Sequence, residues 1–389
     1  MPRSPFNRKS LAIPLLAAAL AAGGCSAKRD HVEPPAKLTE FSASFQPKEI
    51  WSSSSGAADS SGQLALAPFV DQGILVTLDP RGTIAAYDSA TGATRWKHEL
   101  GFAAAGGVGG GSGLVVVSGR EGEIAALDLD SGAQRWKVET GSLVSAPASV
   151  GAGRVALRGA DGRLMVLDAA SGARQWVDTR PVPPLSLRGT GRTLLLEDAV
   201  IAGFDNGELG VYALNNGRKL FSVTVALPSG RSEVERMVDV DSTPLIDRGV
   251  IYALAYQGRL VAIDGAKAQI LWARELSGFN DMAQDRKALY ITDAKGQVMA
   301  IDKRTGSPLW TQSALRARGV TGPTLVKDAL VVGDMEGYLH WLSTEDGRPL
   351  ARLRPLSGAV ISAPRTDGER IFVQGRDGRV AAVEGRPGG

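Results

Sequence analysis

Residues 82–96 read GTIAAYDSATGATRW, and the chemistry of this stretch decides the fold. Gly82 permits a tight turn with positive φ before a strand. The apolar residues that follow alternate, as they do in a strand with a buried face. Asp88 and Gly92 then suit a hairpin turn, and Trp96 lies in the returning strand. We therefore predict a β-hairpin in this segment.

The same pattern recurs along the chain, which identifies a repeat protein. Six further copies have full length and an eighth is cut short by the end of the sequence: GEIAALDLDSGAQRW (122–136), GRLMVLDAASGARQW (162–176), GELGVYALNNGRKLF (207–221), GRLVAIDGAKAQILW (258–272), GQVMAIDKRTGSPLW (296–310), GYLHWLSTEDGRPLA (337–351) and GRVAAVEG (378–385). A short apolar strand precedes each copy, for example ILVTL (74–78) or LVVVS (114–118). An Ala- or Pro-containing segment such as SAPASV (145–150) lies further upstream.

Four short strands in about 40 residues are typical of a propeller blade. We therefore predict an all-β fold, an eight-bladed β-propeller with four antiparallel strands per blade, over residues 40–389. The eighth copy lacks its outer strand. Residues 45–51 (FQPKEIW) match that missing strand, with Trp51 in the place of Trp96. The N-terminal strand is therefore expected to close the last blade, which would remove an open sheet edge.

Six of the seven tryptophans, Trp51 included, share one position on the outer strand. Such residues can be surface contacts for sugars or peptides. A position repeated in every blade favours packing between blades, and we expect that role. Trp341 is off register and has no assigned role at this point.

Residues 1–24 have the pattern of a secretory signal: a basic start, an apolar run of 11–22 and small residues before Cys25. The run is too short to span a bilayer. The segment resembles a bacterial lipobox, which implies cleavage and lipidation at Cys25, the single cysteine of the chain. An ordinary signal peptide is the alternative. By the same resemblance Ser26 implies the outer membrane. Residues 25–39 are polar and are expected to form a flexible tether.

The three basic residues of the first 24 account for the formal charge of +3. Without them the chain has 41 basic and 41 acidic residues, and no basic run is present. This balance gives no general attraction for nucleic acid.

The repeat A-x-D-x-x-T-G-x-x-x-W resembles that of pyrroloquinoline-quinone dehydrogenases, which makes a quinone enzyme the natural catalytic alternative. That family uses a disulfide between adjacent cysteines, which this chain cannot form. The three histidines, His31, His98 and His340, are isolated. No cofactor and no metal are therefore expected, and we predict that the protein is not an enzyme. The glycine-rich stretch GGVGGGSG (106–113) lacks the lysine of a phosphate loop, and we expect a flexible turn there.

The repeat is stretched before Gly207 and before Gly258, where the glycine spacing rises from about 40 to 45 and 51. Insertions map to loops, and loops carry function on a rigid scaffold. The two regions contain PVPPLSLRGTGR (181–192) and LPSGRSEVERMVDVDSTP (227–244).

These loops, the lipobox and the eight repeats resemble the BamB family, the propeller lipoproteins of the outer-membrane β-barrel assembly machinery. The matching segments are LSLRG (185–189) and DVDSTP (239–244). The resemblance implies that the two loops lie together and contact BamA through Leu185, Leu187, Arg188, Asp239 and Asp241. The alternative is structural: an inner strand at Leu185 and Leu187, and a turn shaped by the two aspartates.

The resemblance implies a non-catalytic, outer-membrane, lipid-anchored scaffold facing the periplasm. It would bind the POTRA domains of BamA and help β-barrel precursors fold and insert. Two alternatives stay open: a quinone-binding periplasmic propeller, and an unrelated lipoprotein that acts as a sensor or adhesin.

Overall fold

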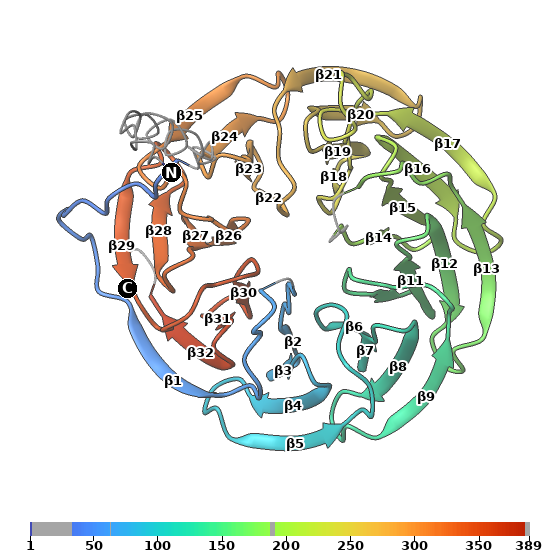
Figure 1. Ribbon diagram of the computed structural model, residues 1–389, viewed down its shortest axis with the longest axis horizontal. Helices are drawn as coiled ribbons and strands as arrows, with labels where there is room; N and C mark the ends of the chain where they lie inside the picture. Colours follow the sequence, from blue (N-terminus) through green and yellow to red (C-terminus); the bar gives the residue numbers. More distant parts are fainter. Residues whose placement is uncertain (2–32, 63, 187–190, 386–389) are drawn as a thin grey trace. The chain divides into compact units, whose positions relative to one another are not determined.

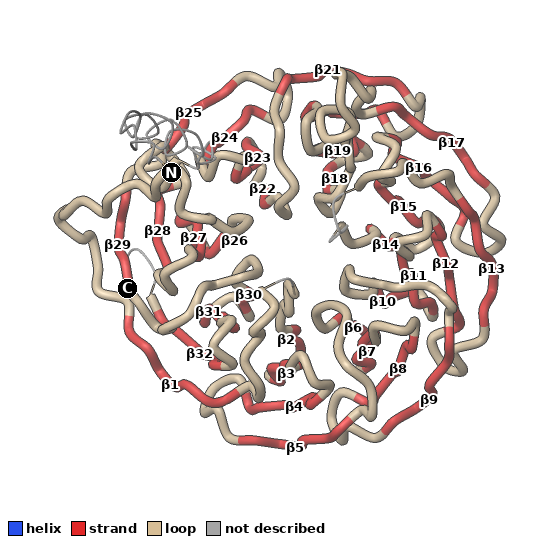
Figure 2. Tube along the Cα trace, in the orientation of Figure 1, coloured by secondary structure: helices blue, strands red, loops and turns tan. Residues whose placement is uncertain are grey.

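The computed structural model describes residue 1 and residues 33–62, 64–186 and 191–385. The chain divides into two compact parts, Met1–Pro34 and Pro35–Gly389. The second part holds every strand, and the described residues contain no helix (Figure 2). None of the described residues therefore forms a helix that could cross a membrane. The prediction of an all-β fold is confirmed.

The strands form groups of four, which we number units 1 to 8. Units 1 to 4 contain β2 (Phe69–Asp71), β3 (Ile74–Leu78), β4 (Thr83–Asp88) and β5 (Thr94–Glu99); β6 (Gly109–Gly111), β7 (Leu114–Ser118), β8 (Glu123–Asp128) and β9 (Gln134–Glu139); β10 (Ser149–Gly151), β11 (Arg154–Arg158), β12 (Arg163–Asp168) and β13 (Arg174–Thr179); and β14 (Leu194–Leu195), β15 (Ala199–Gly203), β16 (Glu208–Ala213) and β17 (Lys219–Thr224).

Units 5 to 8 follow the same order, except that the N-terminal strand completes unit 8. They contain β18 (Leu245–Asp247), β19 (Val250–Leu254), β20 (Arg259–Asp264) and β21 (Gln269–Glu275); β22 (Ala283–Gln284), β23 (Ala288–Thr292), β24 (Val298–Asp302) and β25 (Pro308–Gln312); β26 (Thr324–Val326), β27 (Ala329–Gly333), β28 (Leu339–Ser343) and β29 (Pro349–Leu353); and β30 (Arg365–Thr366), β31 (Arg370–Gln374), β32 (Arg379–Glu384) and β1 (Lys48–Ser54).

Within each unit all neighbouring strands are antiparallel, as the hairpin repeats predict. Units 2 and 3 are joined into one eight-stranded sheet by a single parallel pair, Ser149 with Gly110. β1 pairs antiparallel with β32, and Trp51 lies opposite Ala382, so the two ends of the strand series meet in unit 8. Figure 1 shows the units around a common centre, with the first strand of each unit innermost and the fourth at the rim.

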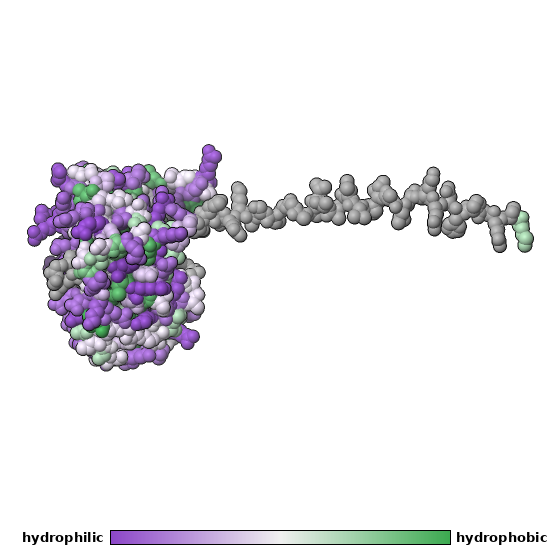
Figure 3. All heavy atoms as spheres, turned by 90° about the vertical axis from the view of Figure 1, so that its left-hand side faces the viewer, coloured by the Kyte–Doolittle hydropathy of each residue, from purple (hydrophilic) through white to green (hydrophobic). Residues whose placement is uncertain are grey.

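The core lies between neighbouring units. The second and third strands are almost wholly buried, and their apolar side chains form clusters shared by adjacent units, such as Val76 and Ile84 of unit 1 with Val115 and Val117 of unit 2. Burying one such side chain contributes about 1.5–3 kcal/mol. The outer strands alternate between exposed and buried positions instead, as β5 does around Trp96. The side of the ring at β29 and β1 is mostly hydrophilic with scattered apolar positions (Figure 3).

The tryptophans fasten each unit to the next. Trp96 Nε1 donates a hydrogen bond to the carbonyl of Leu129 in unit 2 over 2.9 Å. The turn glycine of unit 2, Gly132, lies so close to that ring that a Cβ there would be 2.6 Å from it. The same indole bond recurs for all seven tryptophans: Trp51 to Ser89, Trp136 to Ala169, Trp176 to Leu214, Trp272 to Lys303, Trp310 to Thr344 and Trp341 to Gly385.

Trp341 therefore also packs between units, a role that its position in the repeat did not predict. It lies on β28 opposite Ala351 of β29, which occupies the usual tryptophan position. The ring is fully buried, meets Phe45 edge-on at 6.1 Å and donates to the Gly385 carbonyl. The indole has moved one strand inward while keeping its function. The expectation of inter-blade packing agrees with these contacts.

The glycine-rich stretch 106–113 is not a flexible turn, and that expectation was wrong. It includes β6, the innermost strand of unit 2. A Cβ at Gly109 would lie 2.3 Å from the carbonyl oxygen of Ala148, and one at Gly110 would lie 2.7 Å from the ring of Phe69. Glycine stands here because neighbouring inner strands approach too closely for side chains.

Residues 36–45 form a strap on units 6 and 7. The Ala36 amide donates to the Arg316 carbonyl over 3.0 Å, and the Ser44 amide donates to the Leu350 carbonyl over 2.7 Å. The Ala36 carbonyl accepts from Arg318, whose guanidinium also pairs with the buried Asp334. Residues 36–39, within the segment expected to be a tether, thus contact the ring.

Candidate functional site

The two stretched loops of the repeat meet in the structure. They precede β14 and β18, the innermost strands of units 4 and 5. A Cβ at Gly191 would lie only 2.5 Å from the Asp241 carbonyl oxygen, so the backbones of the two loops are in contact. This contact is what the resemblance led us to expect of loops 181–192 and 227–244.

The tips of these loops expose apolar side chains. Leu227 is 72% exposed, Val234 is 57% exposed and Leu185 is 45% exposed. The tip of the second loop is a turn in which the Arg231 amide donates to Glu235 Oε2 over 2.7 Å. Gln257 Nε2 of unit 5 donates to the Val234 carbonyl over 3.1 Å. The apolar side chains are thus presented on a backbone with defined hydrogen bonds.

The base of the second loop is buried. Asp239 and Asp241 are 0% and 2% exposed, and Val238 and Val240 beside them are equally covered. The Asp239 carbonyl accepts from the Tyr256 amide over 2.8 Å. Asp239 and Asp241 therefore do not present their carboxylates to solvent, and any effect they have on a partner is exerted through the loop.

One buried arginine joins three units beneath the loops. Arg158, at the end of β11 in unit 3, donates from Nη1 to Asp241 Oδ1 over 3.1 Å. Its Nη2 pairs with Asp205, which follows β15 in unit 4. All three side chains are less than 8% exposed. Burial raises the pKa of the Asp241 carboxyl above its ordinary value, although Arg158 opposes this.

Sequence reasoning missed Arg158, yet the repeat contained a signal for it. The residue four places before the repeat glycine is buried or small in every unit: Leu78, Ser118, Gly203, Leu254, Thr292, Gly333 and Gln374. Arg158 is the one charged residue at this position. A charge at a buried repeat position requires a partner, which the stretched loop supplies.

The remaining site predictions have different outcomes. Leu185 is placed at the exposed loop, and the inner strand of unit 4 is β14 (Leu194–Leu195), not a strand at Leu185. Leu187, Arg188 and Cys25 lie outside the described residues. Within the described part of the chain, no group of three or more His, Cys, Asp or Glu side chains could hold a metal ion.

The repeated four-stranded units and their indole bonds define the class: a β-propeller built from PQQ-like repeats. The family model described as outer membrane protein assembly factor BamB matches residues 44–104, 80–312 and 301–388. The chain belongs to the BamB family.

Named relatives agree with this assignment. The outer membrane protein assembly factor BamB of Pseudomonas aeruginosa is 46% identical over 370 residues, 95% of this chain and 97% of that protein. The BamB of Alkalilimnicola ehrlichii is 42% identical over 377 residues, 97% of each chain. Both relatives are named as assembly factors and not as enzymes, in agreement with the prediction of a non-catalytic protein.

Solved structures show the same fold. The crystal structure of BamB from Moraxella catarrhalis matches with a TM-score of 0.80 at 26% identity, covering 87% of this chain and all of that one. A quinohemoprotein alcohol dehydrogenase from Pseudomonas putida matches with a TM-score of 0.70 at 14% identity, over 87% of this chain and 76% of that one. The second likeness concerns the fold alone.

Proposed function

We propose that this protein is a non-catalytic scaffold of outer-membrane β-barrel assembly, an eight-bladed propeller that binds BamA. The name of the relative that is 46% identical over 95% of the chain supports the assembly role. The eight units, each with four strands, support the blade count.

One observation carries the proposed site: the only two long insertions into the repeat touch each other and expose apolar side chains. Leu185 and Leu227 are exposed on neighbouring loops, and Gly191 abuts Asp241. Arginine is enriched among interaction hot spots, and Arg188 belongs to the first of these loops by sequence. We propose that Leu185, Leu187 and Arg188 contact a POTRA domain of BamA.

In this proposal Asp239 and Asp241 are positioning residues. They lie in the buried base of the second loop, and Asp241 is fixed by Arg158. Because the two loops are in backbone contact at Gly191, a shift of Asp241 is expected to displace the first loop as well. Loss of either aspartate is therefore expected to weaken partner binding and stability together.

The test is co-purification of BamA with the tagged full-length protein from membranes. Arg188→Glu is expected to abolish it, because a cationic anchor becomes anionic, while the melting temperature of the purified protein stays unchanged. Arg174→Glu on the outer strand β13 is the matched control and should retain BamA. Undiminished recovery of BamA with Arg188→Glu would remove this site from consideration.

We further propose that residues 1–24 are a signal peptide, that Cys25 is lipidated, and that residues 25–39 connect the lipid to the ring on the periplasmic side of the outer membrane. Cys25→Ser is expected to move the protein from the outer-membrane fraction to the soluble periplasm. Retention of Cys25→Ser in the membrane fraction after a high-salt wash would contradict lipid anchoring.

A further inference from the structure

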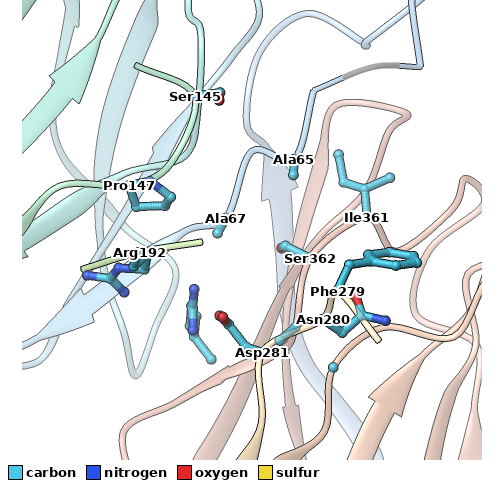
Figure 4. Close-up of a pocket in the computed structure, with 13 residues that line it drawn as sticks. Ala65, Ala67, Ser145, Pro147, Arg192, Phe279, Asn280, Asp281, Ile361 and Ser362 are labelled. Carbon is cyan, nitrogen blue, oxygen red and sulfur yellow. The ribbon is translucent and has the colours of Figure 1, made fainter. Parts of the chain in front are cut away.

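The segments that lead into the innermost strands enclose a cavity of about 70 Å³ at the centre of the ring (Figure 4). Its wall includes Arg192 of the segment before β14, Arg365 at the start of β30, and Asp281 before β22. The volume accommodates several water molecules, and hence a small charged group.

Arg365 is a departure from the repeat, and Arg192 lies in the stretched segment before β14. Residues 145–148 of unit 3 read SAPA, and residues 362–365 of unit 8 read SAPR. After the proline of this segment the other units have uncharged residues: Phe69, Ala148, Leu245 and Thr324. The rest of the cavity wall consists largely of small side chains such as Ala67 and Gly322. Among the described lining residues, the two cations are accompanied by one other charged side chain, Asp281.

Neither guanidinium is neutralised by a described carboxylate. Among the described residues, Arg192 Nη2 donates to the Ala148 carbonyl over 3.2 Å, and Arg365 has no ion-pair partner there. Asp281 is the single acid of the wall, and its Oδ1 already accepts from the amide and hydroxyl of Thr243, over 3.1 and 2.6 Å. The cavity thus has an excess of positive charge.

The two cations also act on each other. Burial and the charge of Arg365 lower the pKa of Arg192 to about 10, while Asp281 opposes this weakly. Arg192 nevertheless remains charged at neutral pH. An anion between the guanidinium groups would relieve their repulsion and accept their free N–H donors.

An apolar surface borders the charged one. Phe279 and Ile361 line the same cavity, and Phe279 is 39% exposed although it contacts Tyr256 edge-on. In Figure 4 these two side chains lie on the side opposite Arg192. The cavity cannot hold a large ligand completely. An elongated ligand would therefore insert its charged end and leave the rest of the molecule outside.

We propose that this central cavity binds a carboxylate at the end of an elongated ligand, held by Arg192 and Arg365, with an apolar group of the ligand against Phe279 and Ile361. The terminal carboxylate of a polypeptide and a free small carboxylic acid share this chemistry. The proposal does not rest on the proposed BamA contact, although Arg192 is the last residue of the first stretched loop (181–192).

Isothermal titration calorimetry on the full mature chain tests the site with three probes: acetyl-Gly-Phe with a free carboxylate, the same peptide as its amide, and acetate. The free acid is expected to bind, and the amide to bind at least about tenfold more weakly. Arg192→Gln and Arg365→Gln should each weaken binding of the acid about tenfold. Arg174→Gln, which removes a cation from the outer strand β13, should leave it unchanged.

Equal binding of acid and amide, no binding of the acid, or unchanged affinity in both arginine variants would overturn the proposal. Acetate that binds as tightly as the peptide acid would overturn its apolar part and leave a simple anion site. Arg192→Lys keeps the charge without the planar fork and should bind between wild type and Arg192→Gln. Thermal unfolding of each variant, expected to match wild type, separates lost binding from lost folding.

Discussion

The junctions between neighbouring units are of two kinds. Seven are fastened by an indole N–H that donates to a carbonyl of the next unit, six from the outer strand and one, Trp341, from the strand beside it. At the junction of units 4 and 5, Phe221 occupies the tryptophan position and has no such donor. The turn glycine that faces the indole at six of the other junctions is there replaced by Ala268, at a φ of 56°.

The exceptional junction is held differently. On its inner side Arg158, Asp205 and Asp241 connect units 3, 4 and 5 through buried ion pairs. The second stretched loop also connects β17 to β18 across this junction, and the first stretched loop contacts it at Gly191. Repeated residues therefore hold the rim of the ring together, whereas individual residues hold the inner side where the two long insertions interrupt the repeat.

Replacing Arg158 tests the inner contact most severely. Arg158→Met leaves Asp205 and Asp241 buried without a cation, so we expect a loss of about 4 kcal/mol in the free energy of unfolding. Urea denaturation measures it. Arg154→Met on the same strand breaks an ion pair with Asp168 at 3.6 Å near the surface and should cost less than about 1 kcal/mol. Similar losses of unfolding free energy in the two variants would show that the buried ion pairs stabilise the protein no more than a surface pair does.

Phe221→Trp tests why the rim differs at the same junction. In unit 2 a Cβ at the turn glycine Gly132 would lie 2.6 Å from the facing indole. Ala268 has such a Cβ at the corresponding position of unit 5, so an indole at position 221 is expected to clash with it. We expect the single variant to lose about 2 kcal/mol of stability. Adding Ala268→Gly should restore most of it, since the indole can then donate to the Gly265 carbonyl. Strictly additive effects in a double-mutant cycle would contradict this coupling.

Trp96→Phe tests the regular junction. An aromatic ring is retained, but the hydrogen bond to the Leu129 carbonyl and part of the buried indole surface are lost, so a cost of about 2 kcal/mol is expected. Trp341→Phe should cost a similar amount, because its indole makes the same kind of bond from the neighbouring strand. A much smaller effect at Trp341 would show that the displaced indole does not replace the usual one.

The smallest effect is expected from the hairpin turns. Hydrogen bonds from Arg95 and Arg135 lower the pKa values of Asp88 and Asp128 to about 2. Because these folded-state values lie below those of the unfolded chain, the turns add stability above pH 4 and lose it as the pH falls towards 2. Asp88→Asn should reduce the drop in melting temperature between pH 5 and pH 2.5. An unchanged drop would assign acid sensitivity to other carboxyl groups.

The sequence predicted the features that depend on repetition. Each copy of the repeat has the same residue types at the same positions. We could therefore infer the hairpins, the N-terminal strand of unit 8 and the packing role of the tryptophans. Trp341 could not be placed, because its role depends on which strand faces the next unit. The glycines at 109–111 were misinterpreted, because their reason is the close approach of Ala148 and Phe69 rather than flexibility.

The candidate site was only partly predictable. The insertions were visible as changes in spacing, and Leu185 lies on an exposed loop. The burial of Asp239 and Asp241 was not visible in the sequence, because the cation that pairs with Asp241, Arg158, lies 83 residues before it in the chain. Long-range charge pairs of this kind have no local periodicity.

The strap of residues 36–45 has a mechanical consequence. Any tension transmitted through the N-terminal segment reaches Ala36 before it reaches β1. The load is borne first by the Arg318 bond to the Ala36 carbonyl and the Ser44 bond to Leu350. These contacts can detach without unzipping the pairing of β1 with β32. We therefore expect a pulling force on the N-terminal segment to release the strap before it acts on the ring.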